Sequence, residues 1–94
     1  MSGQRSVRVR ITGRVQGVGF RGWMVRQANA RNIAGWGRNL SDGAVEAVFC
    51  GPSDVVDDMI EACKNGPNWA NVTSVAVSDE TQDVRGAFTI LNDR

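Results

Sequence analysis

Histidine is absent from this chain of 94 residues, and cysteine and proline occur only twice each. Without histidine there is no histidine general base, no phosphohistidine intermediate and no histidine metal ligand. The spacing of Cys50 and Cys63 fits no zinc site, so the sequence predicts no structural metal. We expect two free thiols, and a disulfide between them is the alternative that the sequence leaves open.

Long apolar runs are also missing. No stretch approaches the roughly 20 residues that a membrane-spanning helix needs, and no signal-peptide pattern opens the chain. Hydrophobic residues make up 41% of the chain and charged residues 22%, which is typical of a soluble globular protein. We therefore expect one cytoplasmic domain over residues 1–94, with no membrane partner.

Acidic residues are missing from the first 40 positions, which contain eight arginines. All ten acidic residues lie in positions 41–94, against three basic ones, so the halves carry +8 and −7 and sum to the net +1. One interpretation is a positive field around an anionic ligand. The other is that the two halves interleave in space and neutralise each other.

Hydrophobic periodicity predicts a βαββαβ order with a short additional strand at the end. The predicted elements are a strand over 6–12, a helix over 20–31, strands over 33–40 and 43–50, a helix with Pro52 at its first position and Lys64 in its last turn, a strand over 72–78 and a short strand over 87–91. Asp42-Gly43 is a hairpin signal. The order predicts an α+β ferredoxin-like sandwich, with two helices on one face of a four- to five-stranded, mainly antiparallel sheet.

A glycine-rich segment, residues 13–21, connects the first predicted strand to the first predicted helix. Loop amides and a helix N-terminus favour an anion, and Arg21 adds a planar donor that suits phosphate. The predicted phosphate-binding loop consists of Val15, Gln16, Gly17, Val18, Gly19 and Phe20. The amides of this loop are the expected donors, and the alternative for the Gln16 side chain is that it simply faces solvent.

Other phosphate motifs do not fit. Residues 17–22 spell G-x-G-x-x-G, with Asp42 downstream, but the hairpin at 42–43 contradicts the parallel dinucleotide-binding fold. No Gly-Lys-Ser/Thr follows the loop, and neither cysteine precedes an arginine by six positions. RNA-recognition domains share the predicted element order but stack bases on aromatic side chains, and here the first strand has none and the third only Phe49.

Two segments resemble the signatures of the acylphosphatase family. The first is residues 13–21, and the second is residues 35–45, which includes Asn39 and is followed by Gly51. The resemblance extends over essentially the whole chain. One departure is Gly37, where the family usually has a small aliphatic residue, and we expect it to loosen the strand that carries Asn39.

The resemblance implies hydrolysis of acyl phosphates to a carboxylate and inorganic phosphate, without a metal or another cofactor. It makes Arg21 and Asn39 the catalytic residues: Arg21 and the loop would hold the phosphoryl group, and Asn39 would orient the attacking water. It implies a monomer that binds a small-molecule acyl phosphate, is inhibited by inorganic phosphate and has no nucleic-acid partner. The alternative is a non-catalytic phosphate or acyl-phosphate binding module. The three tryptophans are expected to serve packing.

Overall fold

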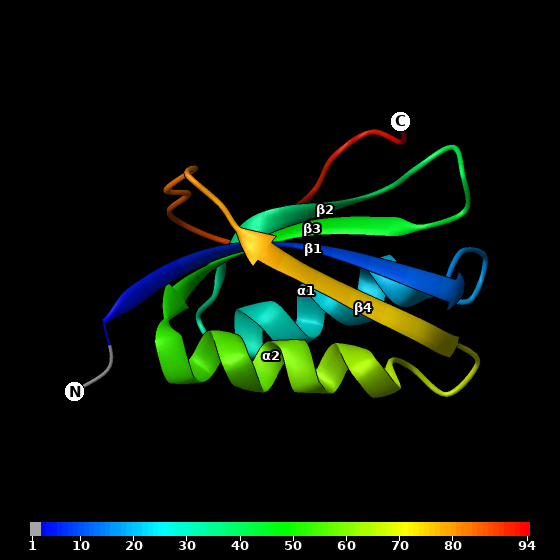
Figure 1. Ribbon diagram of the computed structural model, residues 1–94, viewed down its shortest axis with the longest axis horizontal. Helices are drawn as coiled ribbons and strands as arrows, with labels where there is room; N and C mark the ends of the chain where they lie inside the picture. The colour runs from blue at the N-terminus through cyan, green and yellow to red at the C-terminus, as the bar shows by residue number, and fades with distance from the viewer. Residues whose placement is uncertain (1–2) are drawn as a thin grey trace.

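Two helices cover one face of a five-stranded sheet in the computed structural model, which describes residues 3–94 (Figure 1). The elements in chain order are β1 (Gln4–Arg14), α1 (Phe20–Ala30), β2 (Ala34–Asn39), β3 (Val45–Pro52), α2 (Ser53–Asn65), β4 (Asn71–Asp79) and β5 (Thr89–Ile90). The strands lie in the order β4-β1-β3-β2-β5, and only the β2–β5 pair is parallel. The predicted ferredoxin-like α+β sandwich is confirmed.

The core lies between the sheet and the helices, because each element buries one face. Val7, Val9 and Ile11 alternate along β1 and are fully buried. α1 buries Phe20, Met24 and Ala28 at helical spacing. α2 buries Val56, Met59, Ile60 and Cys63. Each buried valine or larger side chain stabilises the fold by about 1.5–3 kcal/mol relative to exposure.

Small differences separate the predicted and observed element boundaries. α2 begins at Ser53, whereas we predicted Pro52 as its first residue. Pro52 has φ −58° and ψ 140°, so it is the extended capping residue before the helix. The β2–β3 hairpin turns at Leu40–Ala44, where the Asp42 carboxylate accepts from the Ala44 amide at 3.0 Å.

The sheet face opposite the helices is covered by charged pairs around a tryptophan. The guanidinium groups of Arg8 and Arg38 lie over the ring of Trp36, 5.4 Å and 5.0 Å from its centroid. Both arginines form ion pairs with Glu46. Burial raises the pKa of Glu46, but the hydrogen bonds from Arg38 and Arg8 outweigh it and hold the pKa below its ordinary value.

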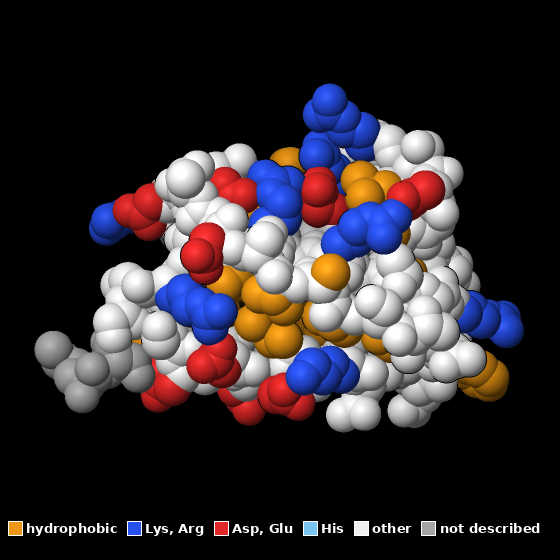
Figure 2. Space-filling model, viewed as in Figure 1, with side chains coloured by type: hydrophobic (Ala, Val, Ile, Leu, Met, Phe, Trp, Pro, Cys, Tyr) orange, Lys and Arg blue, Asp and Glu red, His pale blue; other side chains and the backbone are white. Residues whose placement is uncertain are grey.

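The charge asymmetry between the two halves of the sequence is largely neutralised in space. The pairs that join the halves are Arg5–Asp57, Arg8–Glu46, Arg8–Glu80, Arg10–Asp42, Arg21–Asp93, Arg31–Asp58 and Arg38–Glu46. Figure 2 shows basic and acidic side chains interspersed over the visible surface. The interleaved arrangement therefore accounts for most of these charges. A positive field around an anionic ligand can then be only a local feature.

The tryptophans do not all pack as predicted. Trp36 is 9% exposed and Trp23 packs against the core, but Trp69 is 81% exposed. Trp69 lies in the turn that follows α2 and is largely exposed, so the prediction was wrong for this residue. Within residues 3–94, neither helix is long and apolar enough to cross a membrane.

Candidate active site

The loop between β1 and α1 contains two glycines with a left-handed backbone. Gly17 has φ 73° and Gly19 has φ 78°, values that other residues rarely adopt. In the described part of the chain, no atom beyond the adjoining residues lies near the place where a Cβ would stand at either position, so conformation and not crowding requires glycine. Left-handed residues in such a turn are typical of backbone nests that bind anions.

The loop ends at the N-terminus of α1, which has unused donors. Gly19 caps the helix with its backbone, and its carbonyl accepts from the Trp23 amide at 3.0 Å. Within residues 3–94, no side chain caps this helix end, and its first turn contains no acidic residue. The first amides of a helix have no partner within it, and the helix dipole makes this end positive. Arg21, the second residue of α1, adds its charge here.

A cavity of about 330 Å³ lies over the loop and the helix end. It is lined by Val15, Gln16, Gly17, Gly19, Phe20, Arg21, Gly22, Asn39 and Ile90. The structure thus places both predicted catalytic residues, Arg21 and Asn39, at the same cavity. Of the predicted loop residues, Val18 is not part of the lining and packs against the core instead.

Asn39 is the last residue of β2 and is 8% exposed. It shares the helix-facing side of the strand with Gly37, because side chains alternate along β2. Its backbone is held by pairing with Val45 of β3, and its carbonyl accepts from the Arg94 amide at 2.8 Å. Among residues 3–94, no hydrogen bond engages its carboxamide. The carboxamide at this cavity is therefore available to a ligand or a water molecule.

The side chain of Gln16 does not take the alternative of simply facing solvent. It is half-buried, and its Nε2 donates to the Leu40 carbonyl at 2.8 Å and to the Ala44 carbonyl at 2.9 Å. Both acceptors belong to the β2–β3 turn. The sequence could not indicate this contact, because it depends on the approach of segments that are 24 and 28 residues apart.

Asp93 is a site neighbour that the sequence analysis missed. Its carboxylate accepts from Arg21 Nη1 at 2.8 Å, and both side chains are substantially exposed. The chain after β5 runs beside β2, where the Leu91 amide donates to the Gly37 carbonyl at 2.9 Å. An acidic residue near the end of the sequence has no pattern that marks it. The observed contact places a carboxylate on the guanidinium proposed to bind phosphate.

Gly37 lies in a fully paired part of β2, opposite Ala47 on one side and Ile90 on the other. A Cβ at this position would overlap the terminal methyl group of Met24. Met24 thus fills the room that a side chain at position 37 would take. The pairing of β2 shows none of the loosening that we expected from this glycine.

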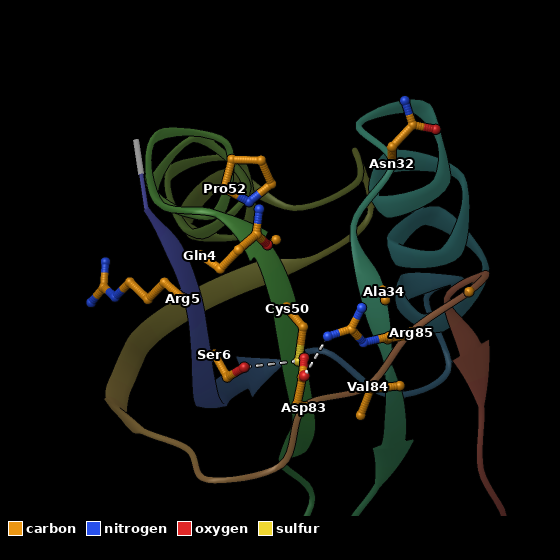
Figure 3. Close-up of a pocket in the computed structure, with 12 residues that line it drawn as sticks. Gln4, Arg5, Ser6, Asn32, Ala34, Cys50, Pro52, Asp83, Val84 and Arg85 are labelled. Carbon is orange, nitrogen blue, oxygen red and sulfur yellow. Dashed lines mark hydrogen bonds and ion pairs between the residues drawn. The ribbon is translucent and has the colours of Figure 1, made fainter. Parts of the chain in front are cut away.

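A larger hollow of about 680 Å³ lies elsewhere, between the start of β1, the end of β3 and residues 83–86 (Figure 3). It contains the Cys50 thiol, which accepts a hydrogen bond from Ser6 at 3.2 Å. The candidate loop follows the opposite end of β1, roughly 30 Å away at about 3.3 Å per residue. This hollow contains neither Arg21 nor Asn39 and is separate from the candidate site.

Comparison with known proteins identifies the family. The family model for acylphosphatase matches residues 7–90. The chain belongs to the acylphosphatase family. It is 57% identical over 65 residues to an acylphosphatase of Nitrobacter hamburgensis, covering 69% of this chain and 66% of that one. Among curated relatives with fuller coverage is an acylphosphatase of Rhizorhabdus wittichii, 45% identical over 87% of this chain and 83% of the relative.

A solved structure shows the same fold. An acylphosphatase from Bacillus subtilis has a TM-score of 0.87 and 37% identity, covering 92% of this chain and 97% of that one. The sequence and structural matches together support acylphosphatase as the function and an enzyme as the class, in agreement with the prediction. They do not favour the alternative of a non-catalytic binding module.

Proposed function

We propose that the loop 15–20 and Arg21 hold the phosphoryl group of an acyl phosphate, and that Asn39 orients the water that attacks phosphorus. The observation that carries this assignment is the meeting of Arg21, Asn39 and the loop at one cavity. The loop glycines, the open helix N-terminus and the guanidinium all favour an anion on that side. The unengaged Asn39 carboxamide lies where a water molecule can reach the bound group.

The reaction needs little from acid–base catalysis. The water oxygen forms a bond to phosphorus, and the bond between phosphorus and the acyl oxygen breaks. The leaving group is a carboxylate, which departs without protonation, and the water proton passes to the phosphate product. Positioning and stabilisation of charge on the phosphoryl oxygens then supply most of the rate acceleration. We propose that no metal or other cofactor takes part.

The proposal includes properties beyond the site. Inorganic phosphate is the product and should inhibit by binding the loop. We propose that residues 1–94 act as one monomeric, cytoplasmic domain. The free thiols of Cys50 and Cys63 suit a reducing compartment and support the cytoplasmic location. We propose no nucleic-acid partner, because Phe49 is buried in the core and offers no surface for base stacking.

The first test is hydrolysis of benzoyl phosphate in the presence of EDTA. The proposal expects turnover that EDTA does not reduce and that inorganic phosphate inhibits competitively. Folded protein that binds phosphate but does not hydrolyse this substrate would instead support a binding module. Turnover that EDTA abolishes and added divalent metal restores would contradict the metal-independent reaction.

Two substitutions test the assigned roles. Arg21→Ala should abolish phosphate inhibition and turnover while the fold persists, and normal phosphate binding by this variant would refute the role of Arg21. Asn39→Ala should retain phosphate affinity and lower kcat by about 10²–10³-fold, because water positioning matters in the transition state. A loss of phosphate affinity of the same size would make Asn39 a ligand contact.

A further inference from the structure

The side chain of Gln16 joins two segments of the candidate site that are distant in sequence. Both hydrogens of its amide nitrogen are engaged, one by the Leu40 carbonyl and the other by the Ala44 carbonyl. If the oxygen and nitrogen of the carboxamide were exchanged, its oxygen would face two carbonyl oxygens and repel them. The orientation with the nitrogen toward the turn is therefore the favourable one. Leu40 and Ala44 are the first and last residues of the β2–β3 turn. The two hydrogen bonds of Gln16, called the Gln16 bridge below, therefore connect both ends of that turn to the loop.

Backbone hydrogen bonds also join the two ends of this turn. The Leu40 amide donates to the Ala44 carbonyl at 2.8 Å, and the Gly43 amide donates to the Leu40 carbonyl at 3.2 Å. Leu40 directly follows Asn39, so the carbonyl that Gln16 holds lies in the Leu40–Ser41 peptide unit, one unit beyond the one that joins Asn39 to Leu40. Fixing that carbonyl limits how far Asn39 can move relative to the loop.

Gln16 is also the only loop residue that can make such a link through its side chain. The other residues from Val15 to Phe20 are apolar or glycine. Val15 and Phe20 are buried and anchor the two ends of the loop in the core. The side-chain hydrogen bonds of Gln16 thus connect the phosphate-binding loop to the strand end that carries Asn39.

We propose that Gln16 is a positioning residue whose side chain sets the separation between the phosphate-binding loop and the Asn39 carboxamide. This inference rests on the proposed function, in which the loop holds the phosphoryl group and Asn39 orients the water. A misplacement of about 1 Å in such an arrangement can cost about 10²-fold in rate. Binding of phosphate alone uses the loop and Arg21 and does not require alignment with Asn39. Loss of the bridge should therefore lower kcat and spare phosphate affinity.

Two substitutions remove the bridge in different ways. Gln16→Met keeps a similar side-chain size but has no donor. Gln16→Glu keeps the shape, but its ionised carboxylate has only acceptors to offer to two carbonyl oxygens. At neutral pH both variants should lower kcat for benzoyl phosphate by about 10–10²-fold. Gln16→Met should change KM and the inhibition constant of inorganic phosphate little, whereas the carboxylate of Gln16→Glu lines the same cavity and should also weaken phosphate binding by charge repulsion.

The pH profile separates positioning from a general structural defect. When the carboxyl group introduced by Gln16→Glu is protonated, it regains one donor and can bond a turn carbonyl again. The ratio of its kcat to that of the wild type should rise as the pH is lowered toward the carboxyl pKa, ordinarily about 4.3 and raised here by the adjacent carbonyl oxygens. The ratio for Gln16→Met should stay flat over the same range.

Gln4 offers matched controls, because it is exposed and lies at the hollow near the opposite end of β1 (Figure 3). Gln4→Met and Gln4→Glu make the same chemical changes and should leave kcat, KM and phosphate inhibition at wild-type values. Urea unfolding of all four variants verifies that each is folded under the assay conditions.

The outcomes distinguish this inference from the proposed function. An inactive wild type overturns both. An active wild type with Gln16 variants of unchanged kcat overturns the positioning role alone. Phosphate inhibition of Gln16→Met that weakens as much as its kcat falls also overturns it, because the side chain would then shape the loop itself. A kcat ratio for Gln16→Glu that does not rise in acid overturns the hydrogen-bond basis of the role.

Discussion

The contact between Gly37 and Met24 leads to a prediction that can be tested with a double-mutant cycle. Gly37 has no side chain, and the Met24 methyl group occupies the space that a Cβ would need. Gly37→Val forces a branched side chain into a filled core, and overpacking of this kind costs about 1–3 kcal/mol. Met24→Ala leaves a cavity beside a fully buried position and should cost about 2–5 kcal/mol.

The double variant should be more stable than the single effects suggest. Valine adds roughly as much side chain as Met24→Ala removes, so the combined change nearly conserves volume. Such exchanges usually cost less than about 1.5 kcal/mol, whereas independent effects would add to about 3–8 kcal/mol. Urea unfolding of the wild type, both single variants and the double variant gives the coupling free energy. Additivity within about 0.5 kcal/mol would show that Met24 does not fill this space.

The same cycle has a kinetic readout. Gly37 and Asn39 share one face of β2, two residues apart, so a displacement of the strand at position 37 also moves Asn39. Gly37→Val should therefore lower kcat more than phosphate affinity, and adding Met24→Ala should restore part of kcat. A restored stability without any recovery of kcat would separate packing at Gly37 from the position of Asn39.

Three further predictions concern charged and titratable groups. Asp93→Asn removes the carboxylate that accepts from Arg21. Inorganic phosphate should then inhibit about 1.4- to fivefold more tightly, since exposed pairs typically contribute about 0.2–1 kcal/mol. Unchanged or weaker inhibition would contradict the competition. The pKa of Glu46 is lowered in the folded state, so its contribution to stability is present above about pH 4.3 and is lost as the pH falls through the folded pKa. In Glu46→Gln, the free energy of unfolding should therefore fall less steeply as the pH is lowered below about 4.3. The same pH dependence as in the wild type would refute that role. Burial raises the pKa of the Cys63 thiol to about 12. In a Cys50→Ala variant, iodoacetamide at pH 8 should therefore modify Cys63 only after unfolding in urea. Rapid labelling of the native protein would contradict this protection.

Several features followed from the sequence because they depend on local chemistry. Alternating valines and isoleucine in residues 7–11 predicted a half-buried strand, and the Asp42-Gly43 pair predicted the hairpin that follows β2. The glycines at 17 and 19, next to a helix start and Arg21, predicted an anion-binding loop. The family resemblance added Asn39, which no local pattern assigns to catalysis, and the fold then placed it at the same cavity as Arg21.

Other features depended on which distant segments meet. The bridge from Gln16 to the β2–β3 turn, the contact of Asp93 with Arg21 and the filling of position 37 by Met24 each join segments from different elements. Residue type and periodicity carry information about neighbours along the chain, whereas these contacts arise from sheet register and helix packing. The sequence by itself determined the element order, the loop and the family, and the tertiary structure decided how the loop, Asn39 and the charges are held relative to one another.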